Sequence, residues 1–130
     1  MGLDIEEAIE LYHRDADRDQ RVHEIAEDST EYGGKRMFAL LIAELIEDTG
    51  TDELYIGPPK RAHCTVYGKK EGERQEWQGI PSPVARNMIG WAKAEMRDGK
   101  IKVKYSGEER SIGVRLVNRR GVEGMVLSIS

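Results

Sequence analysis

Few side chains in this sequence are of the types that ligate metals or act as nucleophiles. His13, His23, His63 and Cys64 are the only histidines and the only cysteine among the 130 residues. No two of them have the four-residue or Cys-x-x-Cys spacing that zinc sites use. On a strand, the adjacent His63 and Cys64 point to opposite faces, which leaves Cys64 without a base to activate it. The sequence therefore predicts no metal site, and a small core residue at Cys64.

Two pairs of glutamates have the spacing of catalytic carboxylates but lie in predicted turns. Glu71 and Glu73 flank a glycine, and Glu108 and Glu109 follow one. General acid–base catalysis requires partial burial to tune the pKa of such groups, whereas a turn leaves them in water. The chain also lacks the Gly-x-x-x-x-Gly-Lys-Ser/Thr loop that holds a triphosphate. We therefore expect no catalytic residue, no cofactor and no enzymatic activity.

Basic residues near the end of the chain are candidates for contacts with phosphate or with an acidic partner. They are Arg115, Arg119 and Arg120, together with the alternating Lys100, Lys102 and Lys104, and Lys69 is a further candidate earlier in the chain. Solvation of an outer sheet face explains the same pattern, and lysines on an exposed strand also deter edge-to-edge pairing. A nucleic-acid site would need a denser basic stripe interleaved with aromatic residues. We therefore expect a protein partner and no nucleic acid.

Two aromatic side chains, Trp77 and Tyr55, are the candidates for a protein interface. Tyr55 lies opposite the apolar residues Leu54 and Ile56 on a predicted strand. Trp77 and Trp91 fit core or sheet packing better than a stacking platform. The apolar stretch 37–46 is open to two interpretations, a helix that docks a partner or a helix packed in the core, and the second is favoured.

Three alternating runs in the last third of the chain predict strands. Their apolar residues are Ile101, Val103, Tyr105, Ile112, Val114, Leu116, Met125, Leu127 and Ile129. Glycine-containing turns at 106–109 and 118–121 separate the runs, which indicates an antiparallel meander with one apolar face. A helix should cover that face. We expect it to begin with Ser82 as N-cap and Pro83 at the first helical position, and to end near Asp98-Gly99.

The first part of the chain repeats this outline. A mostly buried helix is expected from residue 35 to 48, ended by Gly50, and strands are expected over 53–57, 61–69 and 74–79. Ala62, Cys64 and Val66 are candidates for the inner face of the second of these strands. The predicted fold is α+β, a two-layer sandwich in the order helix-βββ-helix-βββ, with an antiparallel sheet of about six short strands and a helical N-terminal extension.

The extension is acidic and the remainder is mildly basic. Residues 1–31 hold eleven acids against three arginines, a net charge of −8, whereas the whole chain carries −4. Weak helical patterns, with Asp4 as a possible cap, predict one or two exposed helices, and a joint is expected at residues 32–34. We therefore divide the chain into an acidic, mainly helical arm, 1–34, and an α+β domain, 35–130. The charge asymmetry fits self-contact, a basic partner or plain solvation.

The sequence contains no apolar run long enough to cross a bilayer and no signal-peptide pattern at its start. A single cysteine excludes an internal disulfide and fits a reducing compartment. These features predict a cytoplasmic protein that does not insert directly into a membrane.

Over roughly residues 36–130 the chain resembles the second N-terminal domain of type II secretion and type IV pilus assembly ATPases. That family has Gly-Ala-Ser-Asp-Ile-His-Ile-Glu-Pro after a helix, and residues 50–58 read Gly-Thr-Asp-Glu-Leu-Tyr-Ile-Gly-Pro here. Similar pieces follow in the family's order: Glu71-Gly72, Trp77, Ile80-Pro81, the helix at 82–96, Gly99-Lys100-Ile101-Lys102-Val103, Gly107, Ile112-Gly113-Val114 and the strand at 122–129.

The departures from the family concern its phosphate contacts. Family arginines on these strands point at ATP held by an adjoining catalytic domain and at neighbouring subunits of a hexamer. The matching positions here hold Thr65 or Tyr67, then Lys69, Gly113 and Ser128. Lysine keeps a charge but loses the planar fork that grips phosphate with two bonds. Arg115, Arg119 and Arg120 lie nearby, although not at the matching positions.

The resemblance implies a non-catalytic interaction or assembly module, at most an accessory part of an ATPase. It would pack against a secretion or pilus motor domain or against a neighbouring copy of itself. One alternative is a fragment of a longer hexameric ATPase whose P-loop domain lies downstream, because the sequence stops on a strand at Ser130. Another is a sensor that holds a small ligand or nucleotide between sheet and helix.

Overall fold

The computed structural model of the chain describes residues 4–47, 51–77 and 79–129. The elements follow one another in the order α1 (Ile5–Arg14), α2 (Arg18–Ala26), α3 (Glu31–Glu47), β1 (Glu53–Ile56), β2 (His63–Cys64), β3 (Val66–Lys70), β4 (Glu73–Glu76), β5 (Ile80–Pro81), α4 (Ser82–Glu95), β6 (Lys100–Tyr105), β7 (Glu108–Arg119) and β8 (Val122–Ile129). Gly50, expected to end the third helix, lies outside the described residues.

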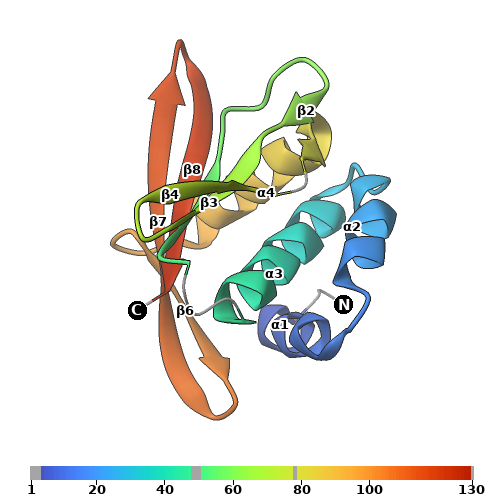
Figure 1. Cartoon of the computed structure of the whole chain (residues 1–130), viewed down its shortest axis with the longest axis vertical. Helices are drawn as coiled ribbons and strands as arrows, with labels where there is room; N and C mark the ends of the chain where they lie inside the picture. The colour runs from blue at the N-terminus through green and yellow to red at the C-terminus, as the bar shows by residue number, and fades with distance from the viewer. Residues whose placement is uncertain (1–3, 48–50, 78, 130) are drawn as a thin grey trace.

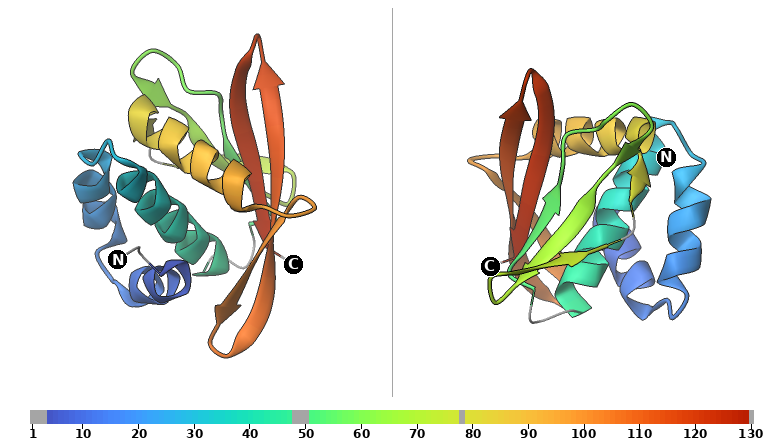
Figure 2. Two further views of the ribbon diagram at one scale, coloured as in Figure 1. Left: turned by 180° about the vertical axis from the view of Figure 1, so that it is seen from behind. Right: turned by 45° about the horizontal axis from the view of Figure 1, so that its top comes forward.

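The fold is an α+β sandwich with an antiparallel sheet, as the sequence predicts. Six strands pair in the order β4-β3-β1-β8-β7-β6, and β2 and β5 form a separate two-stranded sheet. Helices α3 and α4 lie against one face of the curved six-stranded sheet (Figures 1 and 2). Helix α2 packs on α3 on the side away from β7 and β8, whereas α1 packs on α3 and also against β6. The other face of the sheet, which we call the outer face, is covered by none of the helices that the structure describes.

Two-residue turns fix the register of three hairpins. Glu71-Gly72, Ser106-Gly107 and Arg120-Gly121 connect neighbouring strands, and both residues of each turn have positive φ. That combination is the type I′ turn, whose twist matches the twist of the paired strands, and glycine occupies its second position at no steric cost. The predicted meander over β6, β7 and β8 is therefore confirmed.

The prediction of one continuous strand over residues 61–69 is wrong, because the structure has two separate strands there. Residues 63–64 form β2 and pair with β5, whereas β3 begins at Val66 and pairs with β1 and β4. The chain before β2 is held by the start of α4, because the backbone N–H of Ser82 donates to the Ala62 carbonyl and its hydroxyl donates to the Lys60 carbonyl. Ala62 is exposed, while Cys64 and Val66 are buried as expected.

The joint expected at residues 32–34 is absent, because α3 runs through it from Glu31. Gly34 lies where α3 crosses α4, and a Cβ atom built on it would be 2.6 Å from the Asn87 carbonyl carbon. Glycine is therefore required there by the close approach of two helices and not by a turn. The predicted boundary between residues 34 and 35 falls inside this continuous helix.

The two N-terminal helices contribute to the main core, although exposed helices were expected. Their buried side chains join those of α3, α4 and the sheet in one cluster, and they are Ala8, Ile9, Tyr12, Val22 and Ile25. Asp4 caps α1 as predicted, since its carboxylate accepts hydrogen bonds from the backbone N–H groups of Glu6 and Glu7. The acidic arm is thus packed on the rest of the fold.

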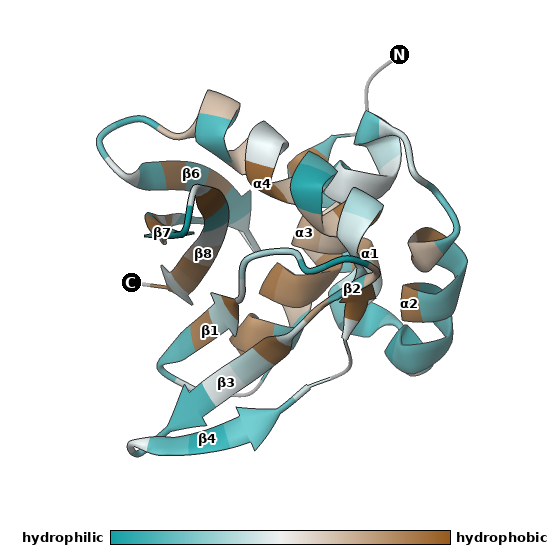
Figure 3. Ribbon diagram, turned by 90° about the horizontal axis from the view of Figure 1, so that it is seen from above, coloured by the Kyte–Doolittle hydropathy of each residue, from teal (hydrophilic) through white to brown (hydrophobic). Residues whose placement is uncertain are grey.

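The apolar stripe of α3 forms the centre of the core. Met37, Phe38 and Leu40 are each at most 1% exposed, and Trp91 of α4 packs its ring 4.9 Å from that of Phe38. The interpretation of residues 37–46 and Trp91 as packing residues is confirmed. Figure 3 shows that α2 and β4, at the edges of the fold, are mostly hydrophilic.

The ends of α4 differ from expectation. Ser82 is the first helical residue and Pro81 occupies the N-cap position, because the Ser82 hydroxyl binds Lys60 instead of capping the helix. The helix ends at Glu95, and Asp98 and Gly99, both with positive φ, form the turn into β6. No helix within the described residues is both long and apolar enough to cross a membrane.

Candidate functional site

Strand register brings side chains from five strands into one row on the outer face. In that row Glu76 pairs with Tyr67, Tyr67 with Tyr55, Tyr55 with Val126, and Val126 with Arg115. Directly paired residues of antiparallel strands point to the same side of a sheet. Tyr55 and Arg115 are more than fifty positions apart in the sequence, and only the insertion of β8 between β1 and β7 brings them together.

The two tyrosines of this row stack on each other. Their ring centroids are 4.8 Å apart and their planes differ by 2°. The guanidinium carbon of Arg74 lies 3.9 Å from the centroid of Tyr67, and the ammonium of Lys69 lies 5.0 Å from that of Tyr55. Cations attracted to aromatic faces are held at a defined position, so both charges are fixed on the outer face of the sheet.

A groove of about 430 Å³ runs beside the tyrosines. We call it the outer-face groove, and its lining residues are Tyr55, Ile56, Gly57, Pro58, Lys60, Thr65, Tyr67, Arg74, Arg115, Val117, Arg119, Met125 and Val126. One end is closed by the segment that leaves β1 and crosses β8. A Cβ atom built on Gly124 would lie 2.6 Å from the Ile56 carbonyl oxygen, so only glycine fits beneath that crossing.

The charge of the outer-face groove is positive. Four of its lining residues are basic and none is acidic. Arg74 pairs with Glu76 at 2.7 Å, and Arg115 approaches Glu53 at 3.6 Å. Neither of these two glutamates lines the groove. Arg119 forms no ion pair with any residue that the structure describes. These guanidinium groups are exposed, so intramolecular pairing holds them weakly and leaves them available to an anionic group.

Several residues singled out from the sequence meet in this region. Tyr55, Arg115 and Arg119 line the groove, and Lys69 lies against the ring of Tyr55. Arg120 does not line it; this residue sits at the first position of the β7–β8 turn with positive φ. Sequence reasoning missed Lys60 and Arg74 as groove residues and did not recognise Tyr67 as the partner of Tyr55.

Trp77 lies in a different place. It lines a hollow of about 290 Å³ with apolar residues such as Val22, Leu41 and Ile80, and the carboxylates Asp19, Glu44 and Glu76 also line this hollow. Its ring also covers Gly68, where an added Cβ would be 3.2 Å from the indole nitrogen. Trp77 is half-buried and packs against the core cluster, so it belongs to the other side of the sheet from Tyr55.

The residues at the family's phosphate positions share the outer face. Gly113 of β7 pairs directly with Ser128 of β8, and the Ser128 hydroxyl fills the space above the glycine, 2.6 Å from where a Cβ would lie. Ser128 is two residues from Val126 and therefore on the same side of the sheet, and Lys69 is two residues from Tyr67. None of Lys69, Gly113 and Ser128 lines the groove itself.

The remaining candidates for chemistry are dispersed or buried. Cys64 is fully buried, its thiol donates to the Gly57 carbonyl at 2.8 Å, and burial raises its pKa to about 11. It is therefore a core residue, as predicted, and a neutral thiol is a poor nucleophile. His13 contacts the hydroxyl of Tyr105 on β6. Within the described ranges, no three His, Cys, Asp or Glu side chains are grouped as metal ligands would be.

The outer-face groove is thus the concave, charged and aromatic surface on which candidate binding residues converge. Comparison of the chain with models of protein families finds no match, and comparison with curated proteins finds none either.

Proposed function

We propose that this protein is a non-catalytic interaction module that binds an anionic protein surface through the outer-face groove. The observation that carries the proposal is the convergence of Arg74, Arg115 and Arg119 around stacked tyrosines on a sheet face without a helix. Tyrosine and arginine are the residue types enriched at the centres of protein interfaces. Guanidinium groups bind carboxylates through two parallel hydrogen bonds, which gives orientation as well as attraction.

A protein partner fits this surface better than a nucleic acid. Single-stranded nucleic acids bind by stacking bases on free aromatic faces. One face of Tyr67 is covered by Tyr55, and Arg74 lies 3.9 Å from its centroid, so no free face of that ring remains for a base. Anionic side chains require no such displacement, because they would meet the guanidinium groups directly.

The resemblance to the secretion and pilus ATPase domain supports a motor domain as one specific partner. The residues at the family's phosphate positions, Lys69, Gly113 and Ser128, lie on the same face as the groove. Cytoplasmic placement is part of this proposal, because a single buried cysteine suits a reducing compartment. Co-elution with a purified hexameric motor tests this specific partner, and separate elution at all salt concentrations argues against it.

A small anionic ligand is the second candidate occupant, favoured by the volume of the groove, about 430 Å³. Pockets of this size hold nucleotides and similar ligands. A thermal-shift screen with ATP, ADP, GTP and inorganic phosphate separates the two functions. A rise in melting temperature that Arg115→Ala abolishes would favour a sensor, whereas unchanged unfolding would leave the protein-binding proposal.

The main test measures binding of a fluorescein-labelled peptide of about ten glutamates, a probe for an anionic protein surface, by anisotropy. We expect binding at low salt that weakens as salt rises. The double variant Arg115→Ala/Arg119→Ala should bind about tenfold more weakly, a loss of ~1.4 kcal/mol.

The matched control is Lys102→Ala/Lys104→Ala, which removes the same charge from exposed positions on β6, outside the groove. It should change the affinity by less than about twofold, as expected for exposed charges at a distance. Equal losses in the two double variants would show attraction to net charge alone and contradict the proposal, as would the absence of binding at low salt.

A further inference from the structure

The acidic helices carry carboxylates that the fold itself does not neutralise. Residues 4–31 contain eleven acids and three arginines. Glu7, Asp17, Asp19, Glu27 and Glu31 are exposed, and their carboxylates form no ion pair with any described residue. Asp19 and Glu27 belong to the α2 region, at its first turn and at its C-cap respectively.

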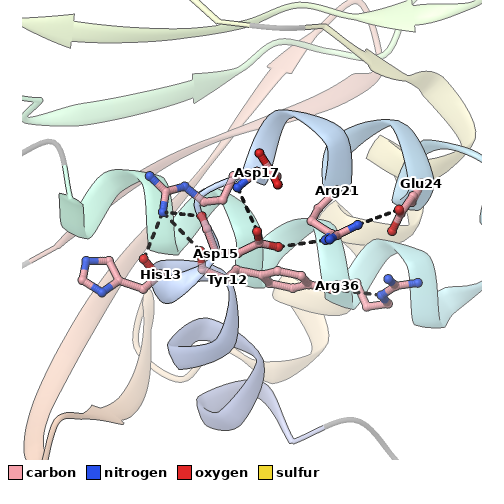
Figure 4. Close-up of polar contacts among 8 residues, drawn as sticks. Tyr12, His13, Asp15, Asp17, Arg21, Glu24 and Arg36 are labelled. Carbon is pink, nitrogen blue, oxygen red and sulfur yellow. Dashed lines mark hydrogen bonds and ion pairs between the residues drawn. The ribbon is translucent and has the colours of Figure 1, made fainter.

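Two of the three arginines in the same segment, Arg18 and Arg21, already form ion pairs within the chain. Arg21 lies between Asp15 and Glu24, with nitrogen–oxygen distances of 2.8 Å and 2.6 Å (Figure 4). Arg18 donates to the carbonyls at the end of α1 and pairs with Glu44 and Glu47 of α3. The net negative charge of α1 and α2 is therefore presented to solvent, fixed on helices that are themselves anchored in the core.

The acidic residues of α2 and the basic groove lie on opposite sides of the molecule. Figures 1 and 3 place α2 on the far side of α3 from β7 and β8, and Arg115 and Arg119 project from β7. The two surfaces therefore cannot meet within one chain. Two copies in the same orientation can bring the helices of one against the groove of the next, which is a heterologous, head-to-tail contact.

We infer that the outer-face groove binds the acidic α1–α2 surface of a second copy of this chain. The inference rests on the proposed function and names its partner. Charge complementarity selects this occupant: exposed carboxylates of α2 meet Arg115 and Arg119, which have weak or no ion pairs of their own. The strength of a contact between opposite charges depends on ionic strength. Repulsion between like charges disfavours the alternative dimers, in which groove meets groove or acidic helices meet acidic helices.

The experiment uses the full chain and two charge-reversed variants. The groove variant carries Arg115→Glu and Arg119→Glu and keeps native helices, whereas the helix variant carries Asp19→Lys and Glu27→Lys and keeps a native groove. Circular dichroism and thermal unfolding establish that each variant folds. Analytical ultracentrifugation then gives the mass at about 0.01 M and about 1 M salt, where the Debye length is about 30 Å and about 3 Å.

The wild-type chain should form assemblies at low salt and sediment as a monomer at high salt. Each variant alone should lose at least about tenfold in association constant. An equimolar mixture of the two should associate again, because the native groove of the helix variant can accept the native helices of the groove variant. The control Lys102→Glu/Lys104→Glu should associate as the wild type does.

A wild-type chain that stays monomeric at low salt overturns the inference, and so does a groove variant that associates normally or a mixture that does not recover. If the helix variant fails to fold, the groove variant is mixed with the wild type, whose native groove should bind it; no complex overturns the inference. If the protein binds the glutamate peptide but stays monomeric, only the self-association is refuted. If the protein does not bind the peptide, the proposed function itself is refuted.

Discussion

Tyr55 and Tyr67 stack in parallel across β1 and β3, with ring centroids 4.8 Å apart. Cross-strand aromatic pairs stabilise antiparallel sheets, and here the pair also forms a wall of the outer-face groove. The same contact therefore links the stability of the β1–β3 pair to the binding surface.

Tyr67→Ala should lower the free energy of unfolding by roughly 1–2 kcal/mol through loss of this stack and of its contact with Arg74. Tyr67→Phe should keep both contacts and change stability by less than about 0.5 kcal/mol. Urea unfolding of both variants, with a double-mutant cycle to Tyr55→Ala, measures the coupling. A coupling of zero would show that the stacked rings do not stabilise each other.

Gly34→Ala should destabilise the protein, because the new Cβ atom would lie 2.6 Å from the Asn87 carbonyl carbon where α3 crosses α4. The expected loss is about 1–3 kcal/mol, the usual result of forcing an extra methyl group into a packed contact.

Gly90→Ala is the matched control, since residue 90 is an exposed position in α4 with open space around its Cα. Alanine there should stabilise the helix by up to about 1 kcal/mol. Thermal unfolding compares the two variants. Equal effects of the two substitutions would contradict the close helix crossing.

Cys64 should make the stability of the protein fall between about pH 9 and pH 11. Burial raises its pKa from 9.0 to about 11, so the folded state disfavours the thiolate and the unfolded chain releases the proton first. The contribution is complete below pH 9.0 and is lost as the pH rises through the folded value. Over that interval the loss amounts to roughly 3 kcal/mol at most.

Other groups titrate in the same range, so the measurement compares the wild type with Cys64→Ala at each pH. The difference in unfolding free energy between them should shrink as the pH rises. A difference that is constant from pH 8 to pH 11 would mean that Cys64 is accessible to water, and rapid labelling by a thiol reagent at neutral pH would lead to the same conclusion.

Arg18→Ala should weaken the attachment of α1 and α2 to the rest of the protein more than the substitution of any exposed residue in these helices. The Arg18 side chain is 14% exposed, and its guanidinium binds the Tyr12, His13 and Asp15 carbonyls as well as Glu44. Removal leaves several acceptors without a donor, at a cost of about 1–3 kcal/mol.

Arg14→Ala is the control, because Arg14 is exposed and, among the residues that the structure describes, makes one hydrogen bond, to the Glu10 carbonyl at 3.3 Å. Limited proteolysis between α1 and α3 reports on detachment directly. Cleavage should be faster in Arg18→Ala and unchanged in Arg14→Ala, and similar rates in the two variants would refute the anchoring role of Arg18.

The sequence correctly predicted those elements that depend on patterns among neighbouring residues. Alternating apolar residues placed β6, β7 and β8, and the glycines at 72, 107 and 121 located the hairpin turns. The burial of α3 followed from its dense apolar residues. Gly33 and Gly34 were misinterpreted because a glycine pair is typical of a turn, and the sequence does not reveal that a second helix passes over it.

The site was only partly predictable. Arg115 and Arg119 were identified as cationic candidates, but their closeness to Tyr55 depends on the strand order β1-β8-β7, which joins opposite ends of the chain. Tyr67 and Arg74 were missed because their roles arise from register: Tyr67 pairs with Tyr55, and Arg74 reaches Tyr67 from the neighbouring strand. Long-range pairing of this kind leaves no local signal in the sequence.

Amide chemical-shift mapping of the labelled protein during titration with the glutamate peptide tests most directly whether the outer-face groove is the binding surface. The largest shifts should fall on residues 55–57, 67, 74, 115–119 and 126, and should disappear in the Arg115→Ala/Arg119→Ala variant. Shifts confined to α4 or to the hollow beside Trp77, with those groove amides unmoved, would contradict the account.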